Sequence, residues 1–479
     1  MQRRRFLTTS GVAALGIGSA AARSEIKTLP ALMPRDKSGH RFVLYSDCCS
    51  GSPKTRAGRN LQAVNAMVSR IRPRPEMIAF PGDAISGYTK DYKELRRQWD
   101  YWQTTEMRWV KQAKIPLYQS TSNHNTYDKE SEAVFREAHP DLPRNGPRGQ
   151  KGLAYWVRRG NMLYVSTHQP DRKMLIDPVW LDRVLTDNAD VPFKFVAGHY
   201  PVFPVNGYEA YPQWCFPPTQ RQPFWDVLVK HRVQAYLASH IIAFDVQVHR
   251  GVPQITSGGA GTNYGPGGFM PGRSEYLHAV QVAIDRQGLR YQVHDVSGRV
   301  RERLSWPLKT TDLDRWSLLK GSSASNTLRR VTWRKEIVGL RFAGRLSARP
   351  ASKSNAQTLL CGIDSSEGVE PVWIGFDDSG RLIVRIVPVS GQGAQLWHGP
   401  LFKAGRFDFQ LCLNPGMGPG GILFRRTNEK EWDSLPSSSS KGLEDLKTPT
   451  RWALGHAQSG IGDRPLNGES RITFSRVSA

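Results

Sequence analysis

Two short apolar runs, each followed by an aspartate, set the architecture of this 479-residue chain. They lie in FVLYSDCC at residues 42–49 and in FPGDA at residues 80–84. In both, a few apolar residues come before the acid, as in a short strand that is buried on both faces. Three later stretches place an amide or imidazole side chain at the same point: TSNHN at 121–125, AGHYP at 197–201 and LASHI at 237–241. Open α/β sheets collect their ligands at the carboxyl ends of the strands, so we expect the five segments to meet at one sheet edge.

Around these segments, from Arg41 to about Trp306, short apolar strands alternate with longer helical patterns, which is typical of a layered α/β domain. After Val248 the pattern changes to hairpins separated by glycine turns, which we expect to form a second sheet that closes on the first. We predict strands at Phe42–Tyr45, Met77–Phe80, Pro116–Gln119, Phe193–Ala197 and Val233–Leu237, and helices at 61–71, Lys90–Lys111, Trp180–Leu185 and Phe224–His231.

From about Arg330 to the end there is almost no helical periodicity, and short strands come at intervals set by turn residues, which favours a β-sandwich. A polar stretch containing KGSSASN predicts a flexible linker at 309–328. The tail, with WALGHAQSG and PLNGESRITFSRV, resembles the final strands of laminin G or concanavalin-like jelly rolls. The predicted strands of the sandwich are Val338–Leu346, Pro371–Phe376, Leu382–Val387, Phe407–Leu413, Gly421–Phe424 and Arg471–Phe474.

The chain begins MQRRRFLTTSGVAALGIGSAAARS, in which the arginines of Arg3–Arg5 precede a weakly apolar run and then small residues. This pattern is typical of a twin-arginine export signal, which we place at residues 1–23 with cleavage near Ala22. The alternative is a basic tail with a membrane anchor, but the apolar run of Gly11–Ile17 is far shorter than the roughly 20 residues of a spanning helix. We therefore expect a periplasmic or extracellular protein that is exported after it has folded.

The chain carries 66 lysines and arginines against 42 acidic residues, a formal net charge of +24. Such a surface attracts anions, so we expect a phosphorylated small molecule or an anionic polymer as the partner. The basic residues are scattered and follow no nucleic-acid-binding motif, which argues against sequence-specific recognition of DNA or RNA. No later segment of the sequence is long and apolar enough to be a transmembrane segment.

The chain has five cysteines, and an odd number in an exported protein leaves at least one thiol unpaired unless it bridges two chains. Cys361 and Cys412 both lie in strand-like runs and could pair. Cys48 could pair with Cys215, or it could equally be a small buried residue.

The five strand-end segments occur in the order of the metal-binding motifs of the calcineurin-like metallophosphoesterases, the superfamily that includes the purple acid phosphatases. The chain resembles that superfamily over about residues 41–300. The resemblance implies a four-layer α/β/β/α metallophosphoesterase domain at 40–308, followed by an all-β jelly-roll sandwich at 329–479. It also implies hydrolysis of phosphoesters with one or two metal ions, because two ions roughly 3.5–4 Å apart can supply a nucleophile from water and neutralise phosphoryl charge.

Carried over position by position, the resemblance gives Asp83 the role of bridging two metal ions. Asn123, His199 and His240 would complete one of the two metal positions, with a mixed nitrogen and oxygen donor set that suits Zn, Mn or Fe. His124 matches the histidine that contacts the phosphate and can protonate the leaving oxygen. This half of the pattern is complete.

The other half departs from the pattern. Asp47 matches its first carboxylate, but Cys49 stands where the superfamily has the next histidine, and Ile242 stands at the last one. A thiolate at Cys49 could bind a metal and would favour Zn or Fe, whereas isoleucine has no donor atom. Tyr88 and Asp245 are close in sequence and could substitute for the missing ligand.

Three serines mark smaller departures. Ser86 stands at the metal-binding tyrosine of the purple acid phosphatases, and Ser122 and Ser239 stand where the superfamily usually has glycine. These changes indicate remodelled loops. His168, in STHQP, lies near the pocket by strand order, although a buried structural histidine is the more ordinary interpretation.

A single Asp, Asn or His past a strand is usually a cap or a surface group, but five in order favour a metal site. The leading hypothesis is an exported metal-dependent phosphoesterase that hydrolyses phosphomonoesters or phosphodiesters and whose sandwich could hold a glycan. The alternative is a catalytically inactive protein of the same fold that binds an anionic or carbohydrate partner. A purely structural envelope protein is disfavoured, because it gives Asn123, His199 and His240 no role.

Overall fold

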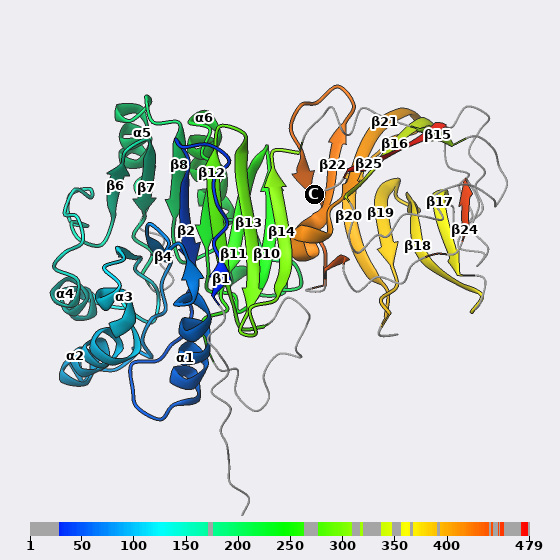
Figure 1. Ribbon diagram of the computed structural model, residues 1–479. Coiled ribbons are helices and arrows are strands. Elements are labelled where there is room, and N and C mark those ends of the chain that lie inside the picture. Colours follow the sequence, from blue (N-terminus) through cyan, green and yellow to red (C-terminus); the bar gives the residue numbers. More distant parts are fainter. Residues whose placement is uncertain are drawn as a thin grey trace, which may run out of the picture.

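The computed structural model describes residues 28–170, 176–262, 276–308, 317–319, 337–346, 356–364, 367–389, 393–439, 442–443, 449, 451–454 and 471–477. The predicted export signal at 1–23 lies outside these residues, and so does the segment at 309–328 except for the strand β15 (Ser317–Leu319). Two pairs of β-sheets lie side by side in Figure 1, and most of the helices accompany the first pair. No helix in the described part of the chain is both long and apolar enough to cross a membrane.

The first pair consists of two six-stranded sheets, with strand orders β14-β13-β12-β2-β4-β5 and β10-β11-β9-β8-β7-β6. In each sheet, neighbouring parallel strands are extended by antiparallel ones. The first sheet contains β2 (His40–Leu44), β4 (Ile78–Phe80), β5 (Leu117–Gln119), β12 (His278–Asp285), β13 (Gly288–Asp295) and β14 (Val300–Trp306). The second contains β6 (Tyr155–Arg159), β7 (Met162–Ser166), β8 (Phe193–Ala197), β9 (Ala235–Ala238), β10 (Phe244–His249) and β11 (Val252–Ser257).

The later hairpins do not form a sheet of their own, so that prediction was wrong. β11 pairs with β9 and brings β10 into the second sheet. β12 instead pairs with β2, with Val280 opposite Leu44, and brings β13 and β14 into the first sheet. These pairings join residues far apart in the sequence. The local pattern of apolar residues does not indicate which sheet edge a later strand will pair with.

Neighbouring residues of β8 show how the layers are stacked. Phe195 enters the core between the two sheets and packs edge-on against Phe42 of β2, with 5.0 Å between the ring centroids. Val196 points to the opposite face, into the core that holds Trp180 of α5 (Pro178–Asp187). α1 (Arg56–Val68) packs against β12 of the first sheet, and its Leu61 is fully buried. The predicted four-layer α/β/β/α arrangement is confirmed.

The predicted helix Lys90–Lys111 is divided in the structure. It consists of α2 (Tyr92–Tyr101), the π-helical turn η1 (Trp102–Glu106) and α3 (Arg108–Gln112). The carboxylate of Glu106 accepts hydrogen bonds from Ser50 Oγ at 2.9 Å and from Gly51 N at 3.0 Å, just after the first strand-end segment. Helical spacing predicts the helix but not the extra residue of a π turn. The remaining helices of this part are α4 (Lys129–Ala138), which was not predicted, and α6 (Pro218–Lys230).

The C-terminal third is antiparallel and almost wholly β, as predicted, and its two sheets enclose a core that includes Phe342, Phe376, Trp397 and Phe409. One sheet contains β15, β16 (Ile337–Leu346), β21 (Gly405–Leu413), β22 (Ile422–Arg426), β23 (Asp433–Ser434) and β25 (Arg471–Val477). The other contains β17 (Gln357–Asp364), β18 (Val369–Phe376), β19 (Arg381–Ile386), β20 (Gln395–Leu401) and β24 (Arg451–Leu454). Of these, β15, β17, β20, β23 and β24 were not among the predicted strands.

All five cysteines are free thiols. Cys361 on β17 and Cys412 on β21 lie in different sheets of the sandwich, so the pairing left open for them does not occur. Cys48 is fully buried, and its Sγ donates to the carbonyl oxygen of Ala84 at 2.9 Å. It is therefore a small buried residue and not a partner of Cys215.

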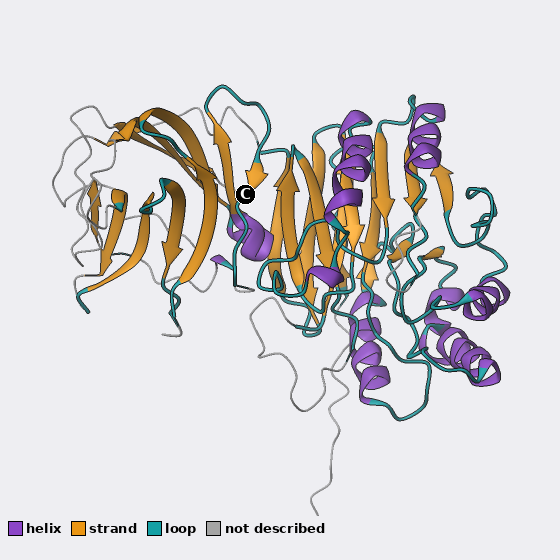
Figure 2. Ribbon diagram, turned by 180° about the vertical axis from the view of Figure 1, so that it is seen from behind, coloured by secondary structure: helices purple, strands orange, loops and turns teal. Residues whose placement is uncertain are grey.

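A glycine-rich turn, η4 (Pro415–Gly421), joins the two parts of the molecule, and Figure 2 shows a helical turn where they meet. It packs against β10 and β14, the end strands of the two sheets of the first pair. Glycine is needed for so close an approach. A Cβ atom at Gly416 would lie 1.8 Å from the carbonyl oxygen of Arg303, and one at Gly420 would lie 1.8 Å from that of Val246.

Asp245, on β10, belongs to this contact and does not replace the missing metal ligand. Its buried carboxylate accepts hydrogen bonds from Gly420 N at 3.1 Å, Asn206 Nδ2 at 3.2 Å and Gln247 Nε2 at 2.8 Å. Every oxygen of this carboxylate thus has a partner within the junction of the two parts. A buried carboxylate is stable where its oxygens accept hydrogen bonds, so these partners hold Asp245 at the junction.

We expect the stability of the protein to depend on the ionisation of Asp245. Burial raises its pKa to about 6, against the hydrogen bonds from Gln247 and Asn206, which lower it. A carboxyl group with a raised pKa contributes stability that is complete below its unfolded pKa, near 4, and is lost as the pH rises through about 6. Urea unfolding should show a loss of about 3 kcal/mol over that interval. Asp245→Asn should flatten this part of the profile, and an unchanged slope would contradict the assignment.

Candidate metal centre

The five strand-end segments meet at one place, and each turns sharply near its polar residue. Asp47 follows β2, Asp83 follows β4, Asn123 and His124 follow β5, His199 follows β8 and His240 follows β9. The φ angles of Asp47, Cys49, Asp83 and His240 are positive, at 62°, 43°, 52° and 67°. Left-handed backbone at a non-glycine residue costs of order 1–3 kcal/mol and is concentrated at functional sites.

Three side chains converge on the Nε2 atom of His199. Asn123 Oδ1 lies 2.6 Å from it, His240 Nδ1 3.0 Å and Asp83 Oδ2 3.4 Å. The other ring nitrogen, Nδ1, carries a hydrogen, because it donates to the carbonyl oxygen of Pro81 at 3.0 Å. In the neutral ring Nε2 is therefore an acceptor, and it faces a carboxylate oxygen and an amide oxygen.

This set of facing acceptors fits a metal ion. Burial lowers the pKa of His199, but the Asp83 carboxylate more than offsets this, so the pKa is raised. A cation in the same position would compete with a proton for Nε2. Burial, together with the charge of His199, lowers the pKa of His240 to about 3, which leaves a neutral imidazole as a ligand. Nitrogen and oxygen donors in this mixture suit Zn, Mn or Fe.

Asp47 lies beside this cluster. Its Oδ2 accepts hydrogen bonds from Ser46 Oγ at 2.8 Å and from the backbone N of His240 at 3.2 Å. Its Oδ1 is buried and has no hydrogen-bond partner in the described part of the chain. Burial raises the pKa of Asp47 to about 7, with His199 acting to lower it and Asp83 to raise it. A buried carboxylate oxygen without a partner is an available metal ligand.

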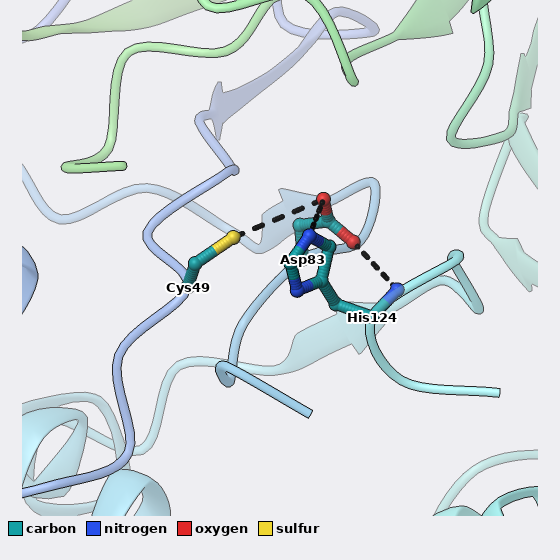
Figure 3. Close-up of side chains that lie close together, drawn as sticks. All are labelled: Cys49, Asp83 and His124. Carbon is teal, nitrogen blue, oxygen red and sulfur yellow. Dashed lines mark hydrogen bonds and ion pairs between the residues drawn. The ribbon is translucent and has the colours of Figure 1, made fainter. Parts of the chain in front are cut away.

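A second cluster contains Cys49, Asp83 and His124, whose ligand atoms all lie within 4.8 Å of one another. In Figure 3 the Cys49 thiol and the His124 ring both approach the Asp83 carboxylate. Cys49 Sγ and His124 Nε2 are each 3.9 Å from Asp83 Oδ2. Burial and the charge of Asp83 raise the pKa of the Cys49 thiol well above its usual value, so it becomes a thiolate only when a cation stabilises it.

Apart from Cys49, the described residues at the positions where the pattern departs are not placed as metal donors. Ile242 is half-buried and carries no donor atom. Ser86 donates its hydroxyl to the carbonyl oxygen of Cys49 at 2.9 Å, so it supports the loop. The Tyr88 ring packs edge-on against the ring of His124, with 4.6 Å between centroids. Of the described residues, Cys49, Asp83 and His124 form the second cluster, and Asp47 belongs to neither cluster.

Two serines that seemed mere departures have definite partners. Ser122 Oγ accepts a hydrogen bond from the backbone N of Asp83 at 2.9 Å, and Ser239 Oγ accepts one from His199 Nδ1 at 2.9 Å. Both hydroxyls fix residues of the two clusters, and hydrogen bonds to the residues that bind a metal orient those ligands. Glu106 supports the loop after Cys49 in the same way, and no pattern in the sequence pointed to it. A strand-end motif in the sequence indicates the donor residues but not the residues that support them.

His168 is structural, as the sequence suggested. Its Nδ1 is 2.9 Å from Thr121 Oγ1 and its Nε2 is 3.3 Å from Glu132 Oε1, and the side chain is buried. Both ring nitrogens therefore have partners away from the metal-binding clusters.

Comparison with known proteins gives likeness of structure only. No family model matches the chain, and no curated protein matches its sequence. Purple acid phosphatase PPD1 of yellow lupin (Lupinus luteus) seeds is 13% identical, with a TM-score of 0.43, and the match covers 57% of this chain and 54% of that one. A dimetal phosphatase of Danio rerio is 14% identical, with a TM-score of 0.39 and coverage of 53% and 95%. GAP50, the anchor in the inner membrane complex of Plasmodium, is 12% identical, with a TM-score of 0.36 and coverage of 57% and 90%.

Proposed function

We propose that this protein is a metal-dependent phosphoesterase that hydrolyses phosphomonoesters or phosphodiesters. The observation that carries the proposal is the convergence of Asp83, Asn123 and His240 on Nε2 of His199, a set of nitrogen and oxygen atoms that suits a metal ion. His124 lies 3.9 Å from the same Asp83 carboxylate, where an acid can act beside the metal ions. Metal, anion-binding charge and a neighbouring acid are the components that phosphoester hydrolysis requires.

The roles proposed for the ligands follow from the two clusters. Asp83 belongs to both clusters and would bridge two ions. Asn123, His199 and His240 would hold one ion, and Asp47 with Cys49 would hold the other, where sulfur favours Zn or Fe. When bound, the ions polarise the phosphoryl oxygens and lower the pKa of water, so that a nucleophile is available at neutral pH.

His124 would act as the general acid. Its Nδ1 donates a hydrogen bond to the carbonyl oxygen of Ser86 at 2.6 Å, which fixes the ring plane. This leaves Nε2 on the side of the Asp83 carboxylate, 3.9 Å away. When the ring is doubly protonated, Nε2 can give its proton to the oxygen of the leaving group.

The same proposal includes a periplasmic or extracellular location, reached by the twin-arginine route. The RRRFL sequence near the N-terminus and the net charge of +24 support an exported protein that meets anionic substrates. A sandwich of the laminin G type could hold the enzyme on a glycan, which the tail of the sequence supports.

The test is metal content per chain by elemental analysis, with hydrolysis of an aryl phosphate and a bis-aryl phosphate assayed on the same sample. We expect one or two equivalents of Zn, Mn or Fe and measurable turnover. His199→Ala should lose at least one equivalent, because it removes the atom on which the other ligands converge. Cys49→Ser should lose metal from the other position only.

A specific observation favours a second candidate, a binding protein of the same fold for an anionic or carbohydrate partner. Ile242 brings no donor to the first metal position, so that position has one ligand fewer than the family pattern. One ion or none, with no turnover after addition of Zn, Mn or Fe, would favour this candidate and exclude the enzyme. Unchanged metal content in His199→Ala would exclude the proposed centre altogether.

A further inference from the structure

Aromatic rings stand next to both outer histidines of the metal centre. On one side the Tyr88 ring contacts His124 and is stacked on Tyr127, with 5.2 Å between the tyrosine centroids. On the other side the ring of Trp214 lies edge to face with the ring of His240, with 6.2 Å between the centroids. The ring of Tyr211 is stacked on that of Trp214, with 4.2 Å between the centroids and nearly parallel planes. We name these pairs the Tyr88 wall (Tyr88 and Tyr127) and the Trp214 wall (Trp214 and Tyr211).

The exposure of these rings is unusual for the molecule. Among the large apolar side chains that are exposed in the described residues, Tyr88 and Tyr211 are the aromatic ones, at 50% and 38%. Each belongs to one of the two walls. Exposed aromatic rings beside a polar centre are typical of ligand recognition, because a planar ring offers a large contact area at little cost in conformational entropy.

The backbone holds the Tyr88 wall in place. Tyr88 has a φ angle of 47°, which is uncommon for a residue other than glycine. The preceding Gly87 is pressed against the backbone of His124, where a Cβ atom would lie 1.6 Å from its carbonyl oxygen. Tyr127 completes the support, since its hydroxyl donates to the carbonyl oxygen of Thr89 at 2.7 Å. Strain of this kind persists only where the surrounding structure enforces it.

The loop that carries the Trp214 wall contacts the sandwich. This loop lies between β8 and α6, and its Gly207 amide donates to the carbonyl oxygen of Ser437 at 3.1 Å. The backbone N of Ser437 in turn donates to Asn206 Oδ1 at 2.8 Å. The loop is thus tied to the sandwich at Asn206 and Gly207, ahead of the wall in the sequence.

Resting on the proposed function, we propose that the two walls bind planar aromatic groups of the substrate, so that the preferred substrates are aryl or nucleoside phosphoesters. The leaving group lies on the Tyr88 wall, beside the acid His124. The second ester group of a diester lies on the Trp214 wall. Hydrolysis forms a P–O bond to water and breaks the P–O bond to the leaving group. A proton passes from His124 Nε2 to the departing oxygen, and the proton lost by water goes to solvent.

The first experiment measures binding, so that it is independent of turnover. Phenylphosphonate and cyclohexylphosphonate are titrated calorimetrically into the metal-loaded full-length protein. These probes share the charged group and differ in the planarity of the ring. We expect the phenyl compound to bind about tenfold more tightly to the unaltered protein, and Tyr88→Leu to abolish the difference. Tyr88→Phe, which keeps the ring and loses the hydroxyl, should retain it. Equal affinities of the two probes, or an effect of Tyr88→Phe equal to that of Tyr88→Leu, would overturn the proposal.

The second experiment separates the two walls by kinetics. Tyr88→Leu should lower kcat/KM for phenyl phosphate about tenfold more than that for methyl phosphate. Tyr211→Leu, at an exposed position, should lower kcat/KM for diphenyl phosphate more than that for phenyl phosphate. Equal losses on aromatic and alkyl substrates would overturn the assignment of the walls. Absence of hydrolysis in the unaltered protein, with the phenyl preference in binding intact, would instead overturn the proposed function and leave the walls as a binding site.

Discussion

Replacing Asp83 with alanine is expected to abolish metal loading and phosphoester hydrolysis together. The Asp83 carboxylate belongs to both clusters, 3.4 Å from His199 Nε2 and 3.9 Å from Cys49 Sγ and from His124 Nε2. Its charge also holds the neighbouring imidazoles in place, and its own pKa is held below the usual range, because His199 and His124 outweigh the effect of burial. We expect a loss of more than about 1,000-fold in kcat and of the bound metal, whether one or two equivalents.

The matched control for this variant is Asp182→Ala. Asp182 lies on α5 in an exposed ion pair with Lys230, and its loss should change metal content and kcat little. Both variants are checked by thermal unfolding, so that a failure to fold is not mistaken for a failure to bind. Retention of both metal equivalents in Asp83→Ala would contradict the bridging position proposed for this carboxylate.

Gly87→Ala is expected to have the second largest effect, although alanine adds a single methyl group. A Cβ atom at Gly87 would lie 1.6 Å from the carbonyl oxygen of His124, so the loop or the His124 backbone has to move. His124 would then lose its position beside Asp83, and Tyr88 would be displaced with it. We expect a loss of stability of about 3 kcal/mol or more in denaturant unfolding, and a fall in kcat of at least about 100-fold with metal content retained.

Gly368→Ala provides a control that separates steric contact from backbone conformation. Gly368 has a φ angle of +65°, close to the +57° of Gly87, but a Cβ atom there would have nothing within 4 Å. Gly368→Ala should lower the free energy of unfolding by about 1 kcal/mol, because alanine is strained in the left-handed backbone conformation. Equal losses of stability in the two variants would show that the contact with His124 is not what makes Gly87 necessary.

The sequence was sufficient to predict the layered fold and the meeting of the strand-end side chains, because both depend on local patterns. Short apolar runs ending in Asp47, Asp83 or His199 specify strands, and the residue after a buried parallel strand lies at the sheet edge. The placing of β12 beside β2, and of β11 beside β9, could not be predicted in this way. Those choices depend on contacts between surfaces that form only when distant segments meet.

Parts of the centre were also beyond prediction from single residues. Ser122 and Ser239 were noted as departures from a family pattern, yet their hydroxyls hold the Asp83 backbone and the His199 ring. Glu106 reaches the loop after Cys49 from a π turn that helical spacing does not record. Asp245 was a candidate ligand by proximity in sequence, but β10 carries it to the junction with the sandwich. Residues that support a site act through geometry, which a linear pattern does not contain.

The turn η4 has a consequence for solubility. β10 and β14 are the end strands of their sheets, and strands with unpaired backbone groups are templates on which chains add to one another as amyloid-like or swapped assemblies. The turn packs against both strands, so one short glycine-rich segment of the sandwich protects both otherwise open ends. The sandwich is therefore not a detachable module. A fragment that ends before the sandwich would expose the unpaired backbone groups of β10 and β14. We expect it to aggregate, even though every layer of the α/β part is intact.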